Sequence, residues 1–237
     1  NGDTAVEANE TFAVNVSNVT GATVSDGSAV ATILNDDSPT LAIADASVAE
    51  GNSGNRTMTF TVTLDRTAPT AVTFDIATAD GTATAGSDYV ALALAGQSIA
   101  AGQTSKTFTV TINGDVAVET NETFTLAIGN VEGATIADGS ATGTITNDDI
   151  PALSISDVSV TEGNSGTSVA TFTVSLDQAA VAPVTFAIAS SNGSAVAGSD
   201  YLSLNLTGQT IAAGQSSKDF SVTINGDTSI EADETLR

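Results

Sequence analysis

An internal repeat of 112 residues constrains this chain more than any other feature of its sequence. Asn1-Gly2-Asp3 returns as Asn113-Gly114-Asp115 and again as Asn225-Gly226-Asp227, without an insertion between copies. Residues 1–37 match residues 113–149 at 24 of 37 positions, which chance cannot produce. A period of this length is too long for a solenoid unit and suits a small domain.

The repeat predicts how the chain is divided. We expect residues 1–37 to be the C-terminal part of one repeat, residues 38–149 to be a complete repeat, and residues 150–237 to be the N-terminal part of a third. Pro39 and Pro151 mark the joints. Because the cut points fall within repeats, we expect the chain to be a piece of a longer protein.

Apolar residues alternate with Thr along the complete repeat, as in Met58, Phe60, Val62 and Leu64. A period of two is typical of strands with one buried face, and Thr suits the exposed face. We expect seven strands, near residues 40–49, 57–65, 71–79, 89–99, 105–113, 122–130 and 139–147. Seven short strands in about 110 residues favour an all-β fold of tandem seven-stranded immunoglobulin-like antiparallel β-sandwiches.

The composition excludes most kinds of site. The chain has no Cys, His or Trp, so thiolate or haem sites and Ser-His-Asp triads cannot form. Five Lys and Arg against 28 Asp and Glu give a net charge of −23, which disfavours nucleic-acid binding and membrane insertion. Hard cations, which prefer oxygen ligands, remain compatible with this composition.

Many carboxylates lie in the turns of the complete repeat. In a sandwich, alternate loops lie at the same end, so these turns can converge on one tip. Carboxylates crowded without a nearby Lys or Arg repel one another, and Ca²⁺ with its 6–8 oxygen ligands would relieve that repulsion. The residues alone leave two interpretations open: a Ca²⁺ site, or acidic turns that only keep the protein soluble.

Several motifs in order resemble the Calx-beta domain, over the complete repeat and over both partial ones. They are Val48-Ala49-Glu50-Gly51, Ala85-Gly86-Ser87-Asp88-Tyr89, Ile112-Asn113-Gly114-Asp115, Glu119-Thr120-Asn121-Glu122 and Ile145-Thr146-Asn147-Asp148-Asp149. The resemblance implies a sandwich that can bind a Ca²⁺ cluster at one tip. The ligands it implies in the complete repeat are Glu50, Asp88, Asp115, Glu119, Glu122, Asp148 and Asp149.

The partial repeats carry the same motifs incompletely. The third supplies Glu162, Asp200, Asp227, Glu231 and Glu234, and the first supplies Asp3, Glu7, Glu10, Asp36 and Asp37. Calcium-sensing members of the family carry runs of three Asp where this chain has Gly114-Asp115-Val116 and Asn147-Asp148-Asp149. This departure implies fewer or weaker ions at each tip.

Near-identical repeats without a distinctive insertion favour a structural function. We expect a calcium-stiffened stalk segment of a large extracellular surface or adhesin protein, whose partners are the neighbouring repeats and, through other domains, a ligand on a host or neighbouring cell. The alternative is a protein- or glycan-binding adhesion module in which calcium matters little. We do not expect an enzyme: Glu119 and Glu122 would need a sugar platform to act as a glycosidase pair, and aromatic residues are only 4%.

Two further expectations concern the tyrosines and the partial repeats. Tyr89 and Tyr201 recur at one repeat position, which favours a structural role. Each partial repeat would expose strand edges and half of a core. Since each supplies what the other lacks, two chains are expected to associate head to tail.

Overall fold

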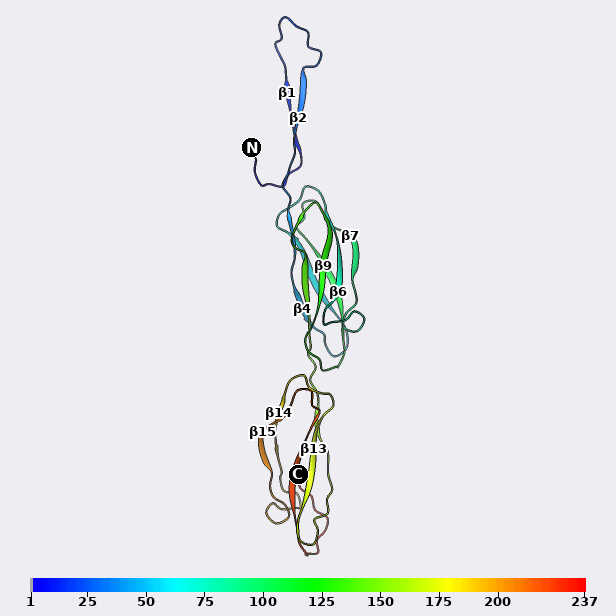
Figure 1. Ribbon diagram of the computed structural model, residues 1–237, viewed down its shortest axis with the longest axis vertical. Coiled ribbons are helices and arrows are strands. Elements are labelled where there is room, and N and C mark those ends of the chain that lie inside the picture. The colour runs from blue at the N-terminus through cyan, green and yellow to red at the C-terminus, as the bar shows by residue number, and fades with distance from the viewer. Residues whose placement is uncertain (1) are drawn as a thin grey trace. The chain divides into compact units, whose positions relative to one another are not determined.

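The computed structural model describes residues 2–237, which contain strands and no helix. The strands fall into two compact units, β1–β11 and β12–β16. Within the first unit, a two-stranded hairpin precedes a complete sandwich (Figure 1). The hairpin consists of β1 (Glu10–Asn15) and β2 (Ser28–Ile33). None of the described segments is a helix long and apolar enough to span a membrane.

The complete repeat folds into two facing sheets. One has the order β10-β3-β5-β8 and the other the order β4-β11-β9-β6-β7. The strands are β3 (Thr40–Ile43), β4 (Ala46–Ala49), β5 (Gly54–Leu64), β6 (Val72–Asp80), β7 (Ala93–Ile99), β8 (Ser105–Gly114), β9 (Glu122–Glu132), β10 (Thr135–Asp138) and β11 (Ser140–Thr146). The all-β sandwich expected from the alternating pattern is therefore confirmed.

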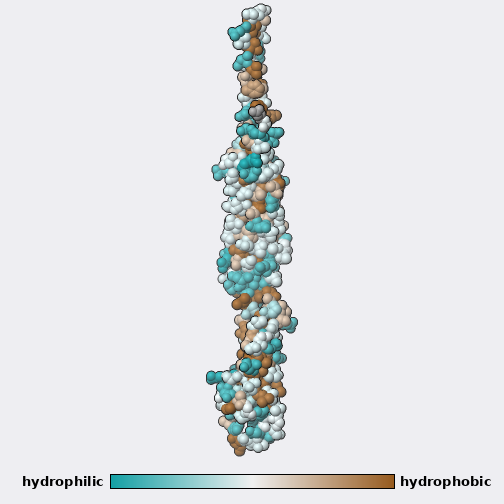
Figure 2. Space-filling view, turned by 90° about the vertical axis from the view of Figure 1, so that its left-hand side faces the viewer, coloured by the Kyte–Doolittle hydropathy of each residue, from teal (hydrophilic) through white to brown (hydrophobic). Residues whose placement is uncertain are grey.

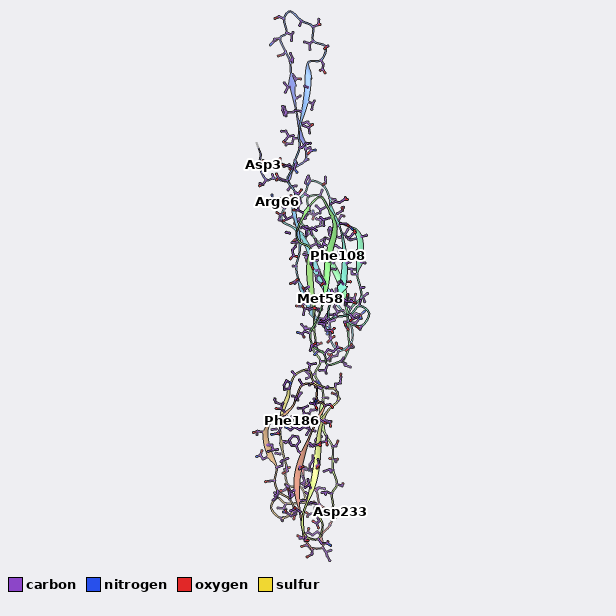
Figure 3. The ribbon with its side chains drawn as sticks, in the orientation of Figure 1. Asp3, Met58, Arg66, Phe108, Phe186 and Asp233 are labelled. Carbon is purple, nitrogen blue, oxygen red and sulfur yellow. The ribbon has the colours of Figure 1, made fainter. Side chains whose placement is uncertain are left out.

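The apolar members of the alternating pattern form the core between the sheets. Met58 and Phe108 are both buried there, and Figure 3 labels them. Phe60 meets Phe124 edge-on, with ring centroids 5.9 Å apart. Tyr89 is also buried and stacks on Phe124 at 4.4 Å, which confirms the structural role expected for this residue.

The structure differs from the sequence prediction at the first strand. Instead of one strand over residues 40–49, β3 lies in one sheet and β4 in the other. Asp45 lies at the crossing, and its Oδ1 accepts a hydrogen bond of 2.7 Å from the Thr142 N–H. Because the chain changes sheets, β3 and β4 pair in parallel with β10 and β11, so the sandwich is not wholly antiparallel.

Two other boundaries also differ from the prediction. The strand expected over 89–99 begins only at Ala93, because the segment before it forms a turn and Tyr89 makes an isolated bridge to Ile112. The short strand β10 was not predicted. It lies in a segment where both faces are exposed, so no alternation of apolar and polar residues marks it.

The β1–β2 hairpin keeps the conformation that its counterpart has in the complete sandwich. Glu10 pairs with Ile33, as Glu122 of β9 pairs with Ile145 of β11. Asn18 between the strands has a left-handed φ of 56°, and its counterpart Asn130 has a φ of 49°. Residues 10–33 thus fold as the last two long strands of the repeat do in the complete sandwich.

The second unit contains the sheets β12-β13-β16 and β14-β15. Their strands are β12 (Leu153–Ile155), β13 (Gly166–Leu176), β14 (Val184–Ala189), β15 (Asn205–Ile211) and β16 (Ser217–Gly226). No described strand corresponds to β4, since β4 pairs only with β11 and the second unit has no counterpart of β11. The repeat boundaries 1–37, 38–149 and 150–237 stay a prediction.

The partial repeats expose apolar side chains that a complete repeat buries. Figure 2 shows apolar side chains at the surface of the hairpin and of the second unit. They include Phe12 and Val14 of the hairpin and Leu153 and Ile155 of the second unit. Phe186, labelled in Figure 3, is only half-buried, whereas its counterpart Phe74 is buried.

Candidate metal centre

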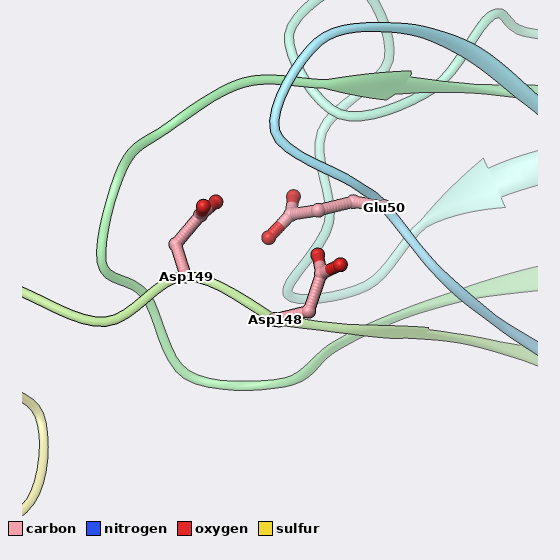
Figure 4. Close-up of side chains that lie close together, drawn as sticks. All are labelled: Glu50, Asp148 and Asp149. Carbon is pink, nitrogen blue, oxygen red and sulfur yellow. The ribbon is translucent and has the colours of Figure 1, made fainter.

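The first acidic cluster forms where two parallel strands end together. Ala49 of β4 pairs with Thr146 of β11, and the Glu50 N–H donates to the Thr146 carbonyl at 3.2 Å. The next residues along each strand therefore emerge side by side. One carboxylate oxygen from each of Glu50, Asp148 and Asp149 lies within 4.8 Å of the others (Figure 4).

Burial increases the repulsion between the carboxylates of this cluster. The residues Glu50 and Asp149 are only 5% and 6% exposed. Two carboxylates that are close together and shielded from water repel more strongly than they would at the surface. An all-oxygen set of this kind suits a hard divalent cation.

Arg56 corrects one expectation for this cluster. We expected no Lys or Arg near the turn carboxylates, but a Cβ added at Gly51 would overlap the Arg56 guanidinium. A protein cation therefore lies against the Glu50 turn. The corresponding residue of the third repeat is Ser168, so the Glu162 turn lacks this charge.

Gly114 allows the Glu50 turn to approach the end of β8. A Cβ at Gly114 would overlap the backbone oxygens of Glu50 and Gly51, and Gly226 stands in the same relation to Glu162 and Gly163. The glycine of the repeated Asn-Gly-Asp motif therefore allows this close approach, in addition to any role in the turn.

The second cluster contains Asp88, Glu119 and Glu122, each half-buried and each offering an oxygen within 4.8 Å of the others. A tight turn holds Asp88: the Thr84 N–H donates to its Oδ2 at 2.6 Å, and its own N–H donates to the Thr84 carbonyl at 3.1 Å. Gly86 in this turn has a φ of 104°, which favours glycine. The Glu-x-x-Glu turn and the Gly-Ser-Asp-Tyr turn thus meet at one place.

The third cluster lies within the second unit and repeats the second one. Asp200, Glu231 and Glu234 offer oxygens within 4.8 Å of one another. Asp227 is the main cause that raises the pKa of Glu231, followed by burial, Asp200 and Glu162. Burial and then Asp200 raise the pKa of Glu234. Asp200 and Glu162 therefore act on both glutamates, and Asp227 acts on Glu231.

The neighbouring backbone stabilises the charged form of Asp200. The Val196 N–H donates to Asp200 Oδ2 at 2.6 Å, and this hydrogen bond is the main cause that lowers the pKa of Asp200. The shifts therefore favour the charged form of Asp200 and disfavour the charged forms of Glu231 and Glu234. A bound cation would favour the ionised form of all three.

The remaining predicted ligands are outside these three groups. Glu162 and Asp227 influence the third cluster only through their charge. The others that the groups do not include are Asp115, Asp3, Glu7, Glu10, Asp36 and Asp37. For every one of these residues, and for the clustered ones, the role of metal ligand stays a prediction.

Asn147 is a positioning residue that the sequence analysis did not single out. Its Oδ1 accepts from the Glu119 N–H at 3.4 Å, and its Nδ2 donates to the Asp149 carbonyl at 3.0 Å. Asn35 makes the matching bonds to Glu7 and Asp37 at 3.3 and 2.7 Å. The recurrence of Asn before each Asp-Asp pair was the available signal.

The model of the Calx-beta domain matches residues 35–149 and again residues 147–237, which together make up most of the chain. The chain belongs to the Calx-beta domain family. This confirms the resemblance drawn from the motifs. No curated protein matches the chain in sequence.

Solved structures similar to this Calx-beta chain carry related descriptions. CBD12 from CALX1.2 is 24% identical, with 81% of this chain and 77% of that chain covered and a TM-score of 0.42. The apo-form Calx CBD1 domain is 25% identical, with coverages of 48% and 100% and a TM-score of 0.40. The structure described as calcium binding domain CBD12 of CALX1.1 is 22% identical, with coverages of 76% and 74% and a TM-score of 0.43.

Proposed function

We propose that this chain binds Ca²⁺ through its three carboxylate clusters. The observation that supports this most directly is the pair of buried carboxylates, Glu50 and Asp149, grouped with Asp148 at the end of two parallel strands. Membership of the Calx-beta family adds to this support. Each cluster offers three carboxylates, and backbone carbonyls and water would supply the rest of the 6–8 oxygens that Ca²⁺ takes.

Melting experiments test calcium binding. A ligand that binds only the folded state stabilises it by RT ln(1 + [L]/Kd), which is about 2.7 kcal/mol at a concentration of roughly 100 Kd. We therefore expect the melting temperature to rise in Ca²⁺ and to fall in chelator. Replacing both Glu119→Gln and Glu122→Gln should remove the part of the rise that comes from the Asp88, Glu119 and Glu122 group.

A matched control separates ligand loss from the loss of negative charge. Glu132→Gln with Asp138→Asn removes the same two charges from exposed positions outside the clusters. This variant should retain the calcium-dependent rise. Equal melting temperatures in Ca²⁺ and chelator for the unaltered chain would contradict the proposal.

We further propose that the bound ion stiffens a stalk in an extracellular surface or adhesin protein. Asp148 and Asp149 directly precede the Ile150-Pro151 linker, so an ion held by them also restrains the start of that linker. Pro151 already limits the conformations of the linker. Near-identical repeats favour such a spacer over an adhesion module that recognises a protein or glycan itself.

Small-angle scattering of the dilute chain tests the stiffening. Ca²⁺ should give a longer and narrower particle than chelator, because coordination removes freedom at the joint. The Glu132→Gln/Asp138→Asn chain should respond in the same way, and an Asp148→Asn/Asp149→Asn chain less, because it lacks the two carboxylates that precede the linker. Superimposable profiles in Ca²⁺ and chelator would contradict the stalk proposal. Calcium binding itself is tested separately by the melting experiment.

A further inference from the structure

The loop that joins β8 to β9 of the complete repeat packs partly with the second unit. It lies between Gly114, where β8 ends, and Glu122, where β9 begins. Its residues Val116–Thr120 belong to the same compact unit as Asn147–Arg237. Glu119, one of the three carboxylates of the second cluster, is in this segment. Contacts that the third repeat makes with the loop therefore reach a candidate ligand of the complete repeat.

Gln178 is the residue of the third repeat that binds this loop. It lies two residues after the end of β13 and is half-buried. Its Nε2 donates to the Val116 carbonyl at 2.7 Å, and its Oε1 accepts from the Val118 N–H at 3.2 Å. A primary amide can make both bonds because it carries a donor and an acceptor side by side. The two bonds fix the backbone directly before Glu119.

Asn147 binds the same loop on the other side of Val118. The Glu119 N–H donates to Asn147 Oδ1, and Asn147 Nδ2 donates to the Asp149 carbonyl. Both asparagine bonds and both Gln178 bonds lie within the second unit. One series of hydrogen bonds therefore connects the third repeat with the backbone of two candidate ligands, Glu119 and Asp149.

The first unit contains a matching bond between the two earlier repeats. Arg66, labelled in Figure 3, is the counterpart of Gln178 at the repeat spacing, and Thr4 is the counterpart of Val116. Arg66 Nη1 donates to the Thr4 carbonyl at 2.5 Å. Two different side chains at one position of the repeat thus reach the same carbonyl of the preceding repeat.

We propose that Gln178 is a positioning residue through which the third repeat prepares the Glu119 loop of the complete repeat for calcium. This inference rests on the proposed calcium function, and the ligands remain those of the complete repeat. Residues 115–121 lie outside the strands, so ordering them when an ion binds would cost conformational entropy. Hydrogen bonds that already exist in the ion-free chain reduce this cost and so strengthen binding.

The variant Gln178→Met removes both hydrogen bonds without a change of charge. Methionine has a similar length, cannot donate to the Val116 carbonyl and is at most a weak acceptor for the Val118 N–H. Because glutamine and methionine are both neutral, any effect on calcium comes through the loop and not through an added or lost charge. The matched control is Gln215→Met, which alters an exposed residue between β15 and β16 of the same unit.

The first measurement needs no calcium. Amide hydrogen exchange, followed by nuclear magnetic resonance in chelator, reports on the Val118 N–H directly. This amide should exchange several-fold faster in the Gln178→Met chain than in the unaltered chain, and at the unaltered rate in the Gln215→Met chain. Unchanged exchange of Val118 in the Gln178→Met chain would overturn the proposal whether or not the protein binds calcium.

The second measurement is a calcium titration that follows the amide signals of Glu119 and Glu231. Gln178→Met should weaken the response at Glu119 by roughly fivefold, the effect of losing about one neutral hydrogen bond. The response at Glu231, which belongs to the third cluster, should not change. The melting temperature in chelator should also stay the same, whereas a merely structural role of Gln178 would lower it.

The outcomes of this titration separate the two proposals. If Glu119 in the unaltered chain does not respond to Ca²⁺, the proposed calcium function of the second cluster is wrong. If Glu119 responds with the same affinity in the unaltered and Gln178→Met chains, calcium binding stands and the positioning role of Gln178 is overturned. An equal loss in the Gln215→Met chain would also overturn that role.

Discussion

Single residues beside the carboxylate clusters determine how strongly each cluster favours a bound cation. In the complete repeat, Arg56 lies against the Glu50 turn and supplies part of the positive charge that an ion would otherwise bring. Ser168 takes this position in the third repeat and supplies none. The Glu50 and Glu162 turns therefore carry equivalent carboxylates, but only the Glu50 turn has an arginine beside it.

This difference predicts the effect of Arg56→Ser. Removing the guanidinium should increase the affinity of the complete repeat for Ca²⁺ by roughly fivefold, since a charge pair near the surface contributes about 1 kcal/mol. Calcium titration at fixed ionic strength measures the change. Arg66→Ser, which removes a cation that pairs with Asp65, is the control. Unchanged or weaker binding in the Arg56→Ser chain would contradict this role.

The buried tyrosine gives a pH-dependent prediction. Burial, and then the 2.6 Å hydrogen bond that the Tyr89 hydroxyl donates to Asp80 Oδ1, raise the pKa of Tyr89 to about 12. Since an ordinary Tyr has a pKa of 10.0, the resulting stabilisation is complete below pH 10 and is lost as the pH rises toward 12. The unfolding free energy of the complete repeat should therefore fall over this range.

Denaturant unfolding at a series of pH values measures this loss, and Tyr89→Phe should flatten it. Asp80→Asn copies the third repeat, where Asn192 accepts from the Tyr201 hydroxyl at 2.8 Å. In this variant the loss should be smaller and should end at a lower pH, because the negative charge that opposes ionisation is gone and the pKa of Tyr89 is raised less. An unfolding free energy that is independent of pH above 10 in the unaltered chain would contradict the prediction.

Pairing between strand elements places the carboxylates, and only part of that pairing could be predicted from sequence. The alternation of apolar residues with Thr identified the strands, because each has one buried and one exposed face. The split of residues 40–49 into β3 and β4 was missed, although the core-facing residues change from odd positions, Leu41 and Ile43, to even positions, Ala46 and Val48, at the crossing. Yet the parallel pairing of β4 with β11 is what brings Glu50 beside Asp148 and Asp149.

The sequence identified which carboxylates are candidate ligands, but it did not show which of them lie together. Their recurrence at a fixed spacing pointed to one tip, whereas the structure divides the complete repeat's carboxylates into two groups and leaves Asp115 outside both. Arg56 was missed because it is six residues from Glu50 in sequence and approaches it only through the fold of the Gly51 turn. Asn147 was missed because an amide adds no charge to the motif.

At the scale of the whole molecule, the repeat produces one complete Calx-beta sandwich and two complementary partial ones. The complete repeat carries two acidic groups, and the second unit carries the third. A calcium-stiffened stalk requires each repeat to bind the ion by itself. The central claim is therefore that this chain binds Ca²⁺ through these groups.

Isothermal titration of the dilute chain with Ca²⁺ tests that claim most directly, with Mg²⁺ as the control ion because it prefers a smaller octahedral site. We predict saturable heat with Ca²⁺ and little with Mg²⁺. The Glu119→Gln/Glu122→Gln chain should lose the part of the heat that belongs to the Asp88, Glu119 and Glu122 group and keep the part that belongs to the other two groups. No saturable heat with Ca²⁺, or the same response in that variant as in the unaltered chain, would contradict the account.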